Sequence, residues 1–96
     1  RLKDDQETTE DMASFLQQEL IVASKVETGY FRSFSLPEKI GGKTYSLLIA
    51  NYTLYVNTSQ AYSMRGIPQV SGNFTVNTVN NITKNETWPY IFLNRN

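Results

Sequence analysis

The chain has 96 residues, enough for one small domain, and 40% of them are hydrophobic. Its nine basic and nine acidic side chains balance, which argues against a nucleic-acid-binding protein, because phosphate contacts need a concentrated excess of Lys and Arg. Neither Cys nor His occurs, so disulfides, thiolate metal sites, His-ligated zinc and His-dependent catalytic triads are excluded.

The first predicted element is a helix from Thr8 to about Val26. Thr8 is the expected N-cap, acidic side chains stand in the first turn, and Lys25 stands in the last. Apolar residues recur along it at spacings of three and four, which predicts a stripe that packs on a sheet. The stripe consists of Met12, Phe15, Leu16, Leu20, Val22, Ala23 and Val26. The residues expected to be buried are Phe15, Leu16, Leu20 and Ala23, and those expected to be exposed are Gln17 and Gln18.

Beyond Gly29 the apolar period changes to two, which predicts strands. The expected strands are residues 30–36, 43–49, 52–57, 70–79 and 88–93. Pro37 stops the first strand, Gly41 and Gly42 mark a tight turn, and the short link at 50–51 predicts a hairpin. Residues 58–69 are expected to be a loop and residues 80–87 a polar turn. The predicted fold class is α+β, with one N-terminal amphipathic helix packed on an antiparallel β-sheet of four to five strands.

No pattern in the sequence indicates a catalytic or metal site. Beyond Asp11 the acidic residues are isolated, so no two carboxylates are spaced for acid–base catalysis. The acidic cluster at 4–11 lacks the glycine and the spacing of a calcium loop, and Gly41-Gly42-Lys43 lacks the frame of a phosphate-binding loop. No Ser–Lys pair is singled out either. We therefore expect a protein that is not an enzyme and that uses no cofactor or metal.

The last 46 residues contain all nine Asn residues of the chain, and between Lys43 and Lys84 the only charged residue is Arg65. Chance placement predicts about two N-x-[ST] sequons, whereas the sequence has five. Asn and Thr are also frequent in polar β domains, but the excess favours a glycosylated cell-surface protein whose sequon Asn side chains point to solvent. The candidate glycosylation sites are Asn51, Asn57, Asn73, Asn81 and Asn85.

Aromatic side chains provide an alternative function. Their flat apolar faces and polar tips suit the binding of sugar rings, as in an extracellular glycan-binding β module. Half-exposed tyrosines are also common in the strands of small β domains, and we favour this packing role. The aromatic residues in question are Tyr52, Tyr55, Tyr62, Trp88 and Tyr90.

Residues 30–45, YFRSFSLPEKIGGKTY, resemble archaeal type IV pilin-like proteins of the class III signal peptide type. In that family a long helix leads into a strand that ends F-x-L-P-x-x-I-G-G-x-x-Y, and a β-hairpin follows. The segment covers about a third of the chain together with the helix before it. The matching residues are Phe34, Leu36, Pro37, Ile40, Gly41, Gly42 and Tyr45.

The resemblance implies a structural or adhesive subunit of a cell-surface type IV pilus-like filament, extracellular and membrane-anchored before assembly. Such pilins begin with an apolar helix, whereas this chain begins with Arg1-Leu2-Lys3-Asp4-Asp5, so we expect the apolar half to have been removed. Residues 1–96 are then a single domain, with 1–28 the end of a longer helix and 29–96 an antiparallel β head. The missing segment would contact other pilin subunits and the membrane. Surface glycans are the alternative partner, and nucleic acid is not expected.

Overall fold

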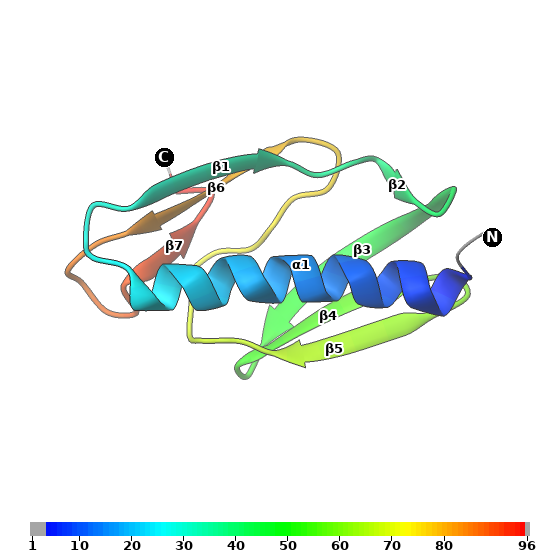
Figure 1. Cartoon of the computed structure of the whole chain (residues 1–96), viewed down its shortest axis with the longest axis horizontal. Helices are drawn as coiled ribbons and strands as arrows, with labels where there is room; N and C mark the ends of the chain where they lie inside the picture. The colour runs from blue at the N-terminus through cyan, green and yellow to red at the C-terminus, as the bar shows by residue number, and fades with distance from the viewer. Residues whose placement is uncertain (1–3, 96) are drawn as a thin grey trace.

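The computed structural model describes residues 4–95, which form one α-helix and seven β-strands (Figure 1). The helix, α1, spans Asp5–Lys25. A three-stranded sheet has the order β1–β6–β7, a four-stranded sheet has the order β2–β3–β4–β5, and neighbouring strands in both are antiparallel. The strands are β1 (Phe31–Ser35), β2 (Lys39–Ile40), β3 (Lys43–Ala50), β4 (Thr53–Thr58), β5 (Tyr62–Gly66), β6 (Val79–Lys84) and β7 (Ile91–Leu93).

The predicted fold class is confirmed, because α1 packs on antiparallel sheets in an α+β arrangement. The strands are divided between two sheets, whereas the sequence predicted a single sheet of four to five strands. The four-stranded sheet is a local meander, but β1 pairs with β6, with Phe31 opposite Thr83. The pairing of β1 with β6 joins strands that are far apart in the sequence, so no local sequence pattern predicts it. In Figure 1, α1 runs along the long axis of the molecule and lies across both sheets.

The helix begins earlier than the sequence predicted. Asp4, not Thr8, is the N-cap: its carboxylate accepts a hydrogen bond from the Glu7 backbone N–H at 2.7 Å. Thr8 lies inside the first turn, where its hydroxyl donates to the Asp4 carbonyl at 2.9 Å. A carboxylate at the cap both satisfies a free N–H group and faces the positive end of the helix dipole, which favours Asp4 over Thr8.

Burial along α1 follows the predicted stripe in part. Leu16, Leu20 and Ala23 are buried together with Ala13 and Thr9, whereas Phe15 and Val22, both predicted to belong to the stripe, are 40% and 46% exposed. Phe15 lies at the margin of the stripe, where its ring meets Phe34 of β1 edge-on with centroids 5.4 Å apart. Gln18 is exposed as predicted. Gln17 is half-buried because its amide donates to the Gly66 carbonyl at 2.9 Å.

Both predicted turns join neighbouring strands of the four-stranded sheet. Gly41 and Gly42, with φ of 56° and 79°, connect β2 to β3. Asn51 and Tyr52, with φ of 51° and 61°, connect β3 to β4 and place Ala50 opposite Thr53. Two successive residues of positive φ match the twist of a two-residue hairpin. Tyr52 therefore belongs to the turn and not, as predicted, to the following strand.

Three strands lie where the sequence predicted none. The short β2 lies between two predicted strands, the expected loop at 58–69 contains β5, and the expected polar turn at 80–87 contains most of β6. Residues 70–78, predicted as strand, form no named strand, although Phe74 is buried as the pattern indicated. The inward positions of β5 and β6 include the buried polar residues Ser63 and Asn80, which interrupt the apolar alternation that identifies strands.

Candidate functional site

The structure brings three of the five candidate aromatic residues to one pocket. Tyr52 comes from the β3–β4 turn, whereas Trp88 and Tyr90 come from the segment between β6 and β7. The Trp88 and Tyr90 rings meet edge to face with centroids 5.6 Å apart, and the Trp88 side chain is 63% exposed. The pocket has a volume of about 220 Å³. Its remaining walls are Ser24, Pro68, Gln69, Lys84, Pro89 and Ile91.

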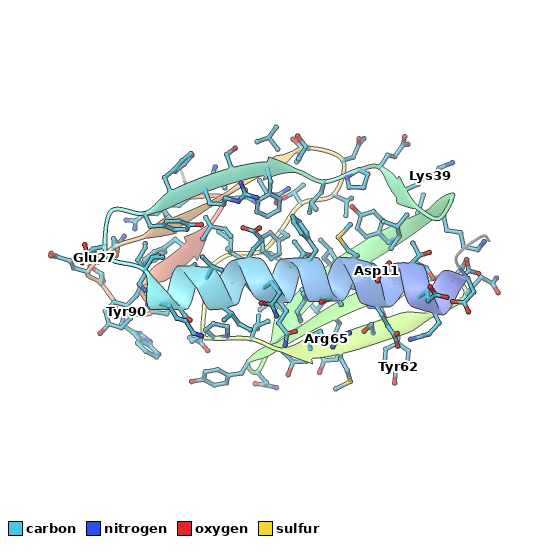
Figure 2. The ribbon with its side chains drawn as sticks, viewed as in Figure 1. Asp11, Glu27, Lys39, Tyr62, Arg65 and Tyr90 are labelled. Carbon is cyan, nitrogen blue, oxygen red and sulfur yellow. The ribbon has the colours of Figure 1, made fainter. Side chains whose placement is uncertain are left out.

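The other two aromatic residues lie elsewhere. Tyr55 is on β4 and Tyr62 on β5, and neither lines the pocket. Figure 2 shows Tyr90 near the C-terminal end of α1 and Tyr62 beside its N-terminal half, so the five rings do not form one platform. Of the five aromatic residues that the sequence singled out, the structure brings only Tyr52, Trp88 and Tyr90 together.

The pocket is apolar despite the presence of Lys84. The Lys84 ammonium donates to the carbonyl oxygens of Ala23 and Val26, at 2.8 and 3.1 Å, and so caps the C-terminal end of α1. These bonds place the positive charge at the negative end of the helix dipole and give the ammonium two acceptors within the fold. The lining contains no carboxylate, so the pocket is suited to holding a flat, weakly polar ring and not to acid–base chemistry.

Sequence reasoning missed Lys84 and Gln69 as parts of this pocket. Lys84 reaches the end of α1 from a position 61 residues after Ala23, and no periodicity encodes that contact. Gln69 follows Pro68 in a segment that has no regular structure. Among residues 4–95, no three potential metal-ligating side chains lie close enough together to hold an ion.

The five sequon Asn residues differ in how they meet solvent. Asn51 and Asn73 are exposed, as the glycosylation hypothesis expects, whereas Asn57, Asn81 and Asn85 are half-buried. The Asn73 and Asn85 side-chain oxygens accept bonds from the backbone N–H groups of Phe74 and Thr87, both at 2.9 Å. The Asn81 side-chain oxygen is buried. Asn81 is thus the sequon least available for modification on the folded chain.

The chain matches no model of a known protein family, no curated protein and no solved structure. The resemblance to pilin-like proteins therefore rests on the residues in segment 30–45. Within the described part of the chain, no helix is both long and apolar enough to span a membrane.

Proposed function

We propose that this chain is the outward-facing head of a cell-surface, pilin-like filament subunit, with a structural or adhesive role and no catalytic role. The observation that carries the proposal is the position of α1. A helix of 21 residues is about 32 Å long, roughly three quarters of the 43 Å length of the molecule. Its Asp5 end lies at one extreme of the molecule (Figure 1), so a preceding helix could leave the domain without meeting a strand.

The residues that carry the family resemblance each have a structural role, which supports the proposal. Leu36 and Ile40 are buried on either side of the link between the two sheets. The Tyr45 hydroxyl donates to the Pro37 carbonyl at 2.7 Å and closes this link. These residues of the motif contribute to packing and to the link between the sheets, which is what a motif that specifies a fold requires.

The N-cap at Asp4 sets a condition on the proposal. Asp4 has an extended backbone, with φ −81° and ψ 172°, and its carboxylate bonds the Glu7 N–H. A helix continuous with a preceding segment requires Asp4 to take helical angles and to release that bond. A pilin-like subunit therefore has either a break in its helix at Asp4 or a rearranged first turn.

The test is a localisation experiment in the natural host with the full-length product of the gene. These 96 residues contain no Cys, so Glu38→Cys, at an exposed position, introduces the one thiol of this domain. We expect a membrane-impermeant maleimide to label it on intact cells, and filaments sheared from those cells to contain the labelled protein. The matched control is Val56→Cys, whose fully buried position stays unlabelled when the domain is folded. Labelling of Glu38→Cys only after lysis would contradict the proposal.

A glycan-binding function is the second candidate, since Tyr52, Trp88 and Tyr90 line one pocket and all three are exposed. Trp88 is the only Trp in the chain, so its fluorescence reports directly on this pocket. If the pocket binds glycans, oligosaccharides should change the Trp88 fluorescence in a saturable way. Tyr90→Ala should abolish this change, whereas Tyr62→Ala, outside the pocket, should leave it intact. An unchanged spectrum across a panel of neutral and N-acetylated sugars rejects it.

A further inference from the structure

The four-stranded sheet has an exposed face that is turned away from α1. We define this outer face by the outward positions of β3, β4 and β5, which alternate with buried residues such as Tyr45, Leu54, Val56 and Ser63. The register aligns Leu48, Tyr55 and Met64 in one row across the three strands. The outer face comprises Thr44, Ser46, Leu48, Tyr55, Asn57, Tyr62 and Met64.

Within β3, β4 and β5 the outer face combines large apolar side chains with no charged residue, and at its edge the exposed Lys39 of β2 lies opposite Thr44. Leu48 is 52% exposed and Met64 is 53% exposed, and Tyr62 at the edge strand is exposed as well. The charged residues of these strands, Lys43 and Arg65, stand at inward positions of the alternation, and the Lys43 ammonium lies 3.5 Å from the Asp5 carboxylate on α1. An apolar patch of this kind marks a surface that something else covers.

Asn57 lies on β4, the central one of these three strands, one residue before the end of that strand. It lies opposite Ser46 on one side and Tyr62 on the other, and it follows Tyr55 by two residues, so both side chains leave the same face of β4. Its side-chain amide makes no hydrogen bond to residues 4–95, whereas the oxygens of Asn73 and Asn85 are already bonded. Beside it is a shallow hollow of about 290 Å³. The hollow is lined by Thr44, Tyr45, Ser46, Asn57, Thr58 and Ser59.

We propose that Asn57 is the principal N-glycosylation site and that its first sugar lies at the edge of this hollow, against Tyr55 of the outer face, which does not itself line the hollow. A pyranose ring has an apolar C–H face and a polar rim. The C–H face packs on the electron-rich face of the Tyr55 ring, and the rim hydroxyls meet the hydroxyls of Thr44 and Ser46. The occupant is therefore the chain's own glycan. The inference rests on the proposed extracellular location but not on filament assembly.

The modification requires an activated donor, which is a saccharide joined through its anomeric carbon to a phosphate or pyrophosphate carrier. A bond forms between the Asn57 Nδ2 and the anomeric carbon, and the bond from that carbon to the carrier oxygen breaks. The carrier leaves with that electron pair, and the amide nitrogen loses one proton to the transferase. Because the Asn57 amide makes no hydrogen bond to residues 4–95, the reaction breaks no contact within the described part of the chain.

The packing of the sugar can be tested without the natural host. Asn57→Cys and, as a matched control, Asn51→Cys each give a unique thiol, which is alkylated with an iodoacetamide derivative of N-acetylglucosamine. We expect the sugar at position 57 to raise the melting temperature by about 4 °C or more and to lower the binding of an apolar fluorescent dye. The sugar on the exposed turn at position 51 should change neither. Tyr55→Ala in the Asn57→Cys background should remove the gain.

Equal effects at positions 57 and 51 would overturn the packing. A concentration-dependent dimer of the unmodified chain that Leu48→Ser together with Met64→Ser abolishes would also overturn it, because a second copy would then be the occupant. Occupancy is measured by mass spectrometry of protein from the natural host. Trypsin leaves residues 44–65 as one peptide that holds both Asn51 and Asn57, so cleavage after aromatic residues must separate them. If Asn57 is unmodified in surface-exposed protein, the glycosylation proposal is overturned. If Asn57 is modified but the protein is in no filament, the glycosylation proposal is upheld and the filament role is rejected.

Discussion

Asn80 of β6 accepts, through its side-chain oxygen, a hydrogen bond of 2.8 Å from the side-chain amide of Asn94. The same oxygen accepts from the Thr75 backbone N–H at 2.7 Å, and the Asn80 amide donates to the Thr75 carbonyl at 2.7 Å. Asn80 is fully buried, so these bonds replace all of its contact with water. One side chain thus joins β6 to the irregular segment before it and to the residue that follows β7.

The substitution Asn80→Ala should destabilise the domain strongly. It removes the Asn80 partner of the Thr75 N–H and of the Thr75 carbonyl, and it removes one of the two bonds that the Asn94 amide donates. A buried polar group left unpaired costs about 1–3 kcal/mol. We expect the free energy of unfolding, measured with urea, to fall by at least about 2 kcal/mol. Thr75→Ala, which removes an exposed side chain and keeps the backbone bonds, is the control and should stay within about 0.5 kcal/mol of the parent. Equal midpoints for the two variants would contradict the structural role of Asn80.

Asn80 also shows why the sequence predicted some elements and missed others. The helix and the β3–β4 hairpin follow from local periodicity and from turn residues, and the structure confirms them. The strand β6 was missed because Asn80 occupies an inward position, where the pattern requires an apolar residue. The aromatic pocket was predicted in part: Trp88 and Tyr90 are neighbours in sequence, but the contribution of Lys84 depends on the distant end of α1.

The helix stripe predicts a second set of outcomes. Leu16 and Leu20 are completely buried, so truncation of either to Ala leaves a cavity as well as removing apolar contacts. Either change should lower the free energy of unfolding by about 2–5 kcal/mol. Gln18→Ala is the matched control on the exposed side of α1, and it should stay within about 0.5 kcal/mol of the parent. A denaturant midpoint equal to that of the parent for Leu20→Ala would mean that the stripe does not pack on the sheets in solution.

The capping of α1 by Lys84 predicts that Lys84→Met is destabilising. The Met side chain keeps most of the apolar contacts of Lys but cannot donate to the Ala23 and Val26 carbonyls. We expect a loss of about 1–2 kcal/mol in thermal or urea unfolding, together with fraying of the last helical turn in amide hydrogen exchange. Lys39→Met, at an exposed position of β2, is the control for removal of one positive charge. Unchanged protection of the last turn in Lys84→Met would show that the cap contributes nothing.

Tyr45 gives the domain a predictable response to alkaline pH. Burial raises the pKa of the Tyr45 hydroxyl above its ordinary value of 10.0, because the charged phenolate is poorly solvated there. The folded state therefore holds this proton more tightly than the unfolded chain does. The contribution of this group to the free energy of unfolding is constant below about pH 10. It decreases as the pH rises from there toward the folded-state pKa.

The substitution Tyr45→Phe separates the two contributions of that hydroxyl. At neutral pH the variant loses the bond to the Pro37 carbonyl and should be less stable by about 0.5–1.5 kcal/mol. Above about pH 10, unfolding of the parent releases the Tyr45 proton, whereas the variant has no proton to release at this position. The difference in unfolding free energy between the two proteins should therefore narrow as the pH rises. Unfolding free energies of the two proteins measured from pH 8 to pH 11 report this gap directly. A constant gap between the parent and Tyr45→Phe would show that the Tyr45 hydroxyl is not buried in the folded protein.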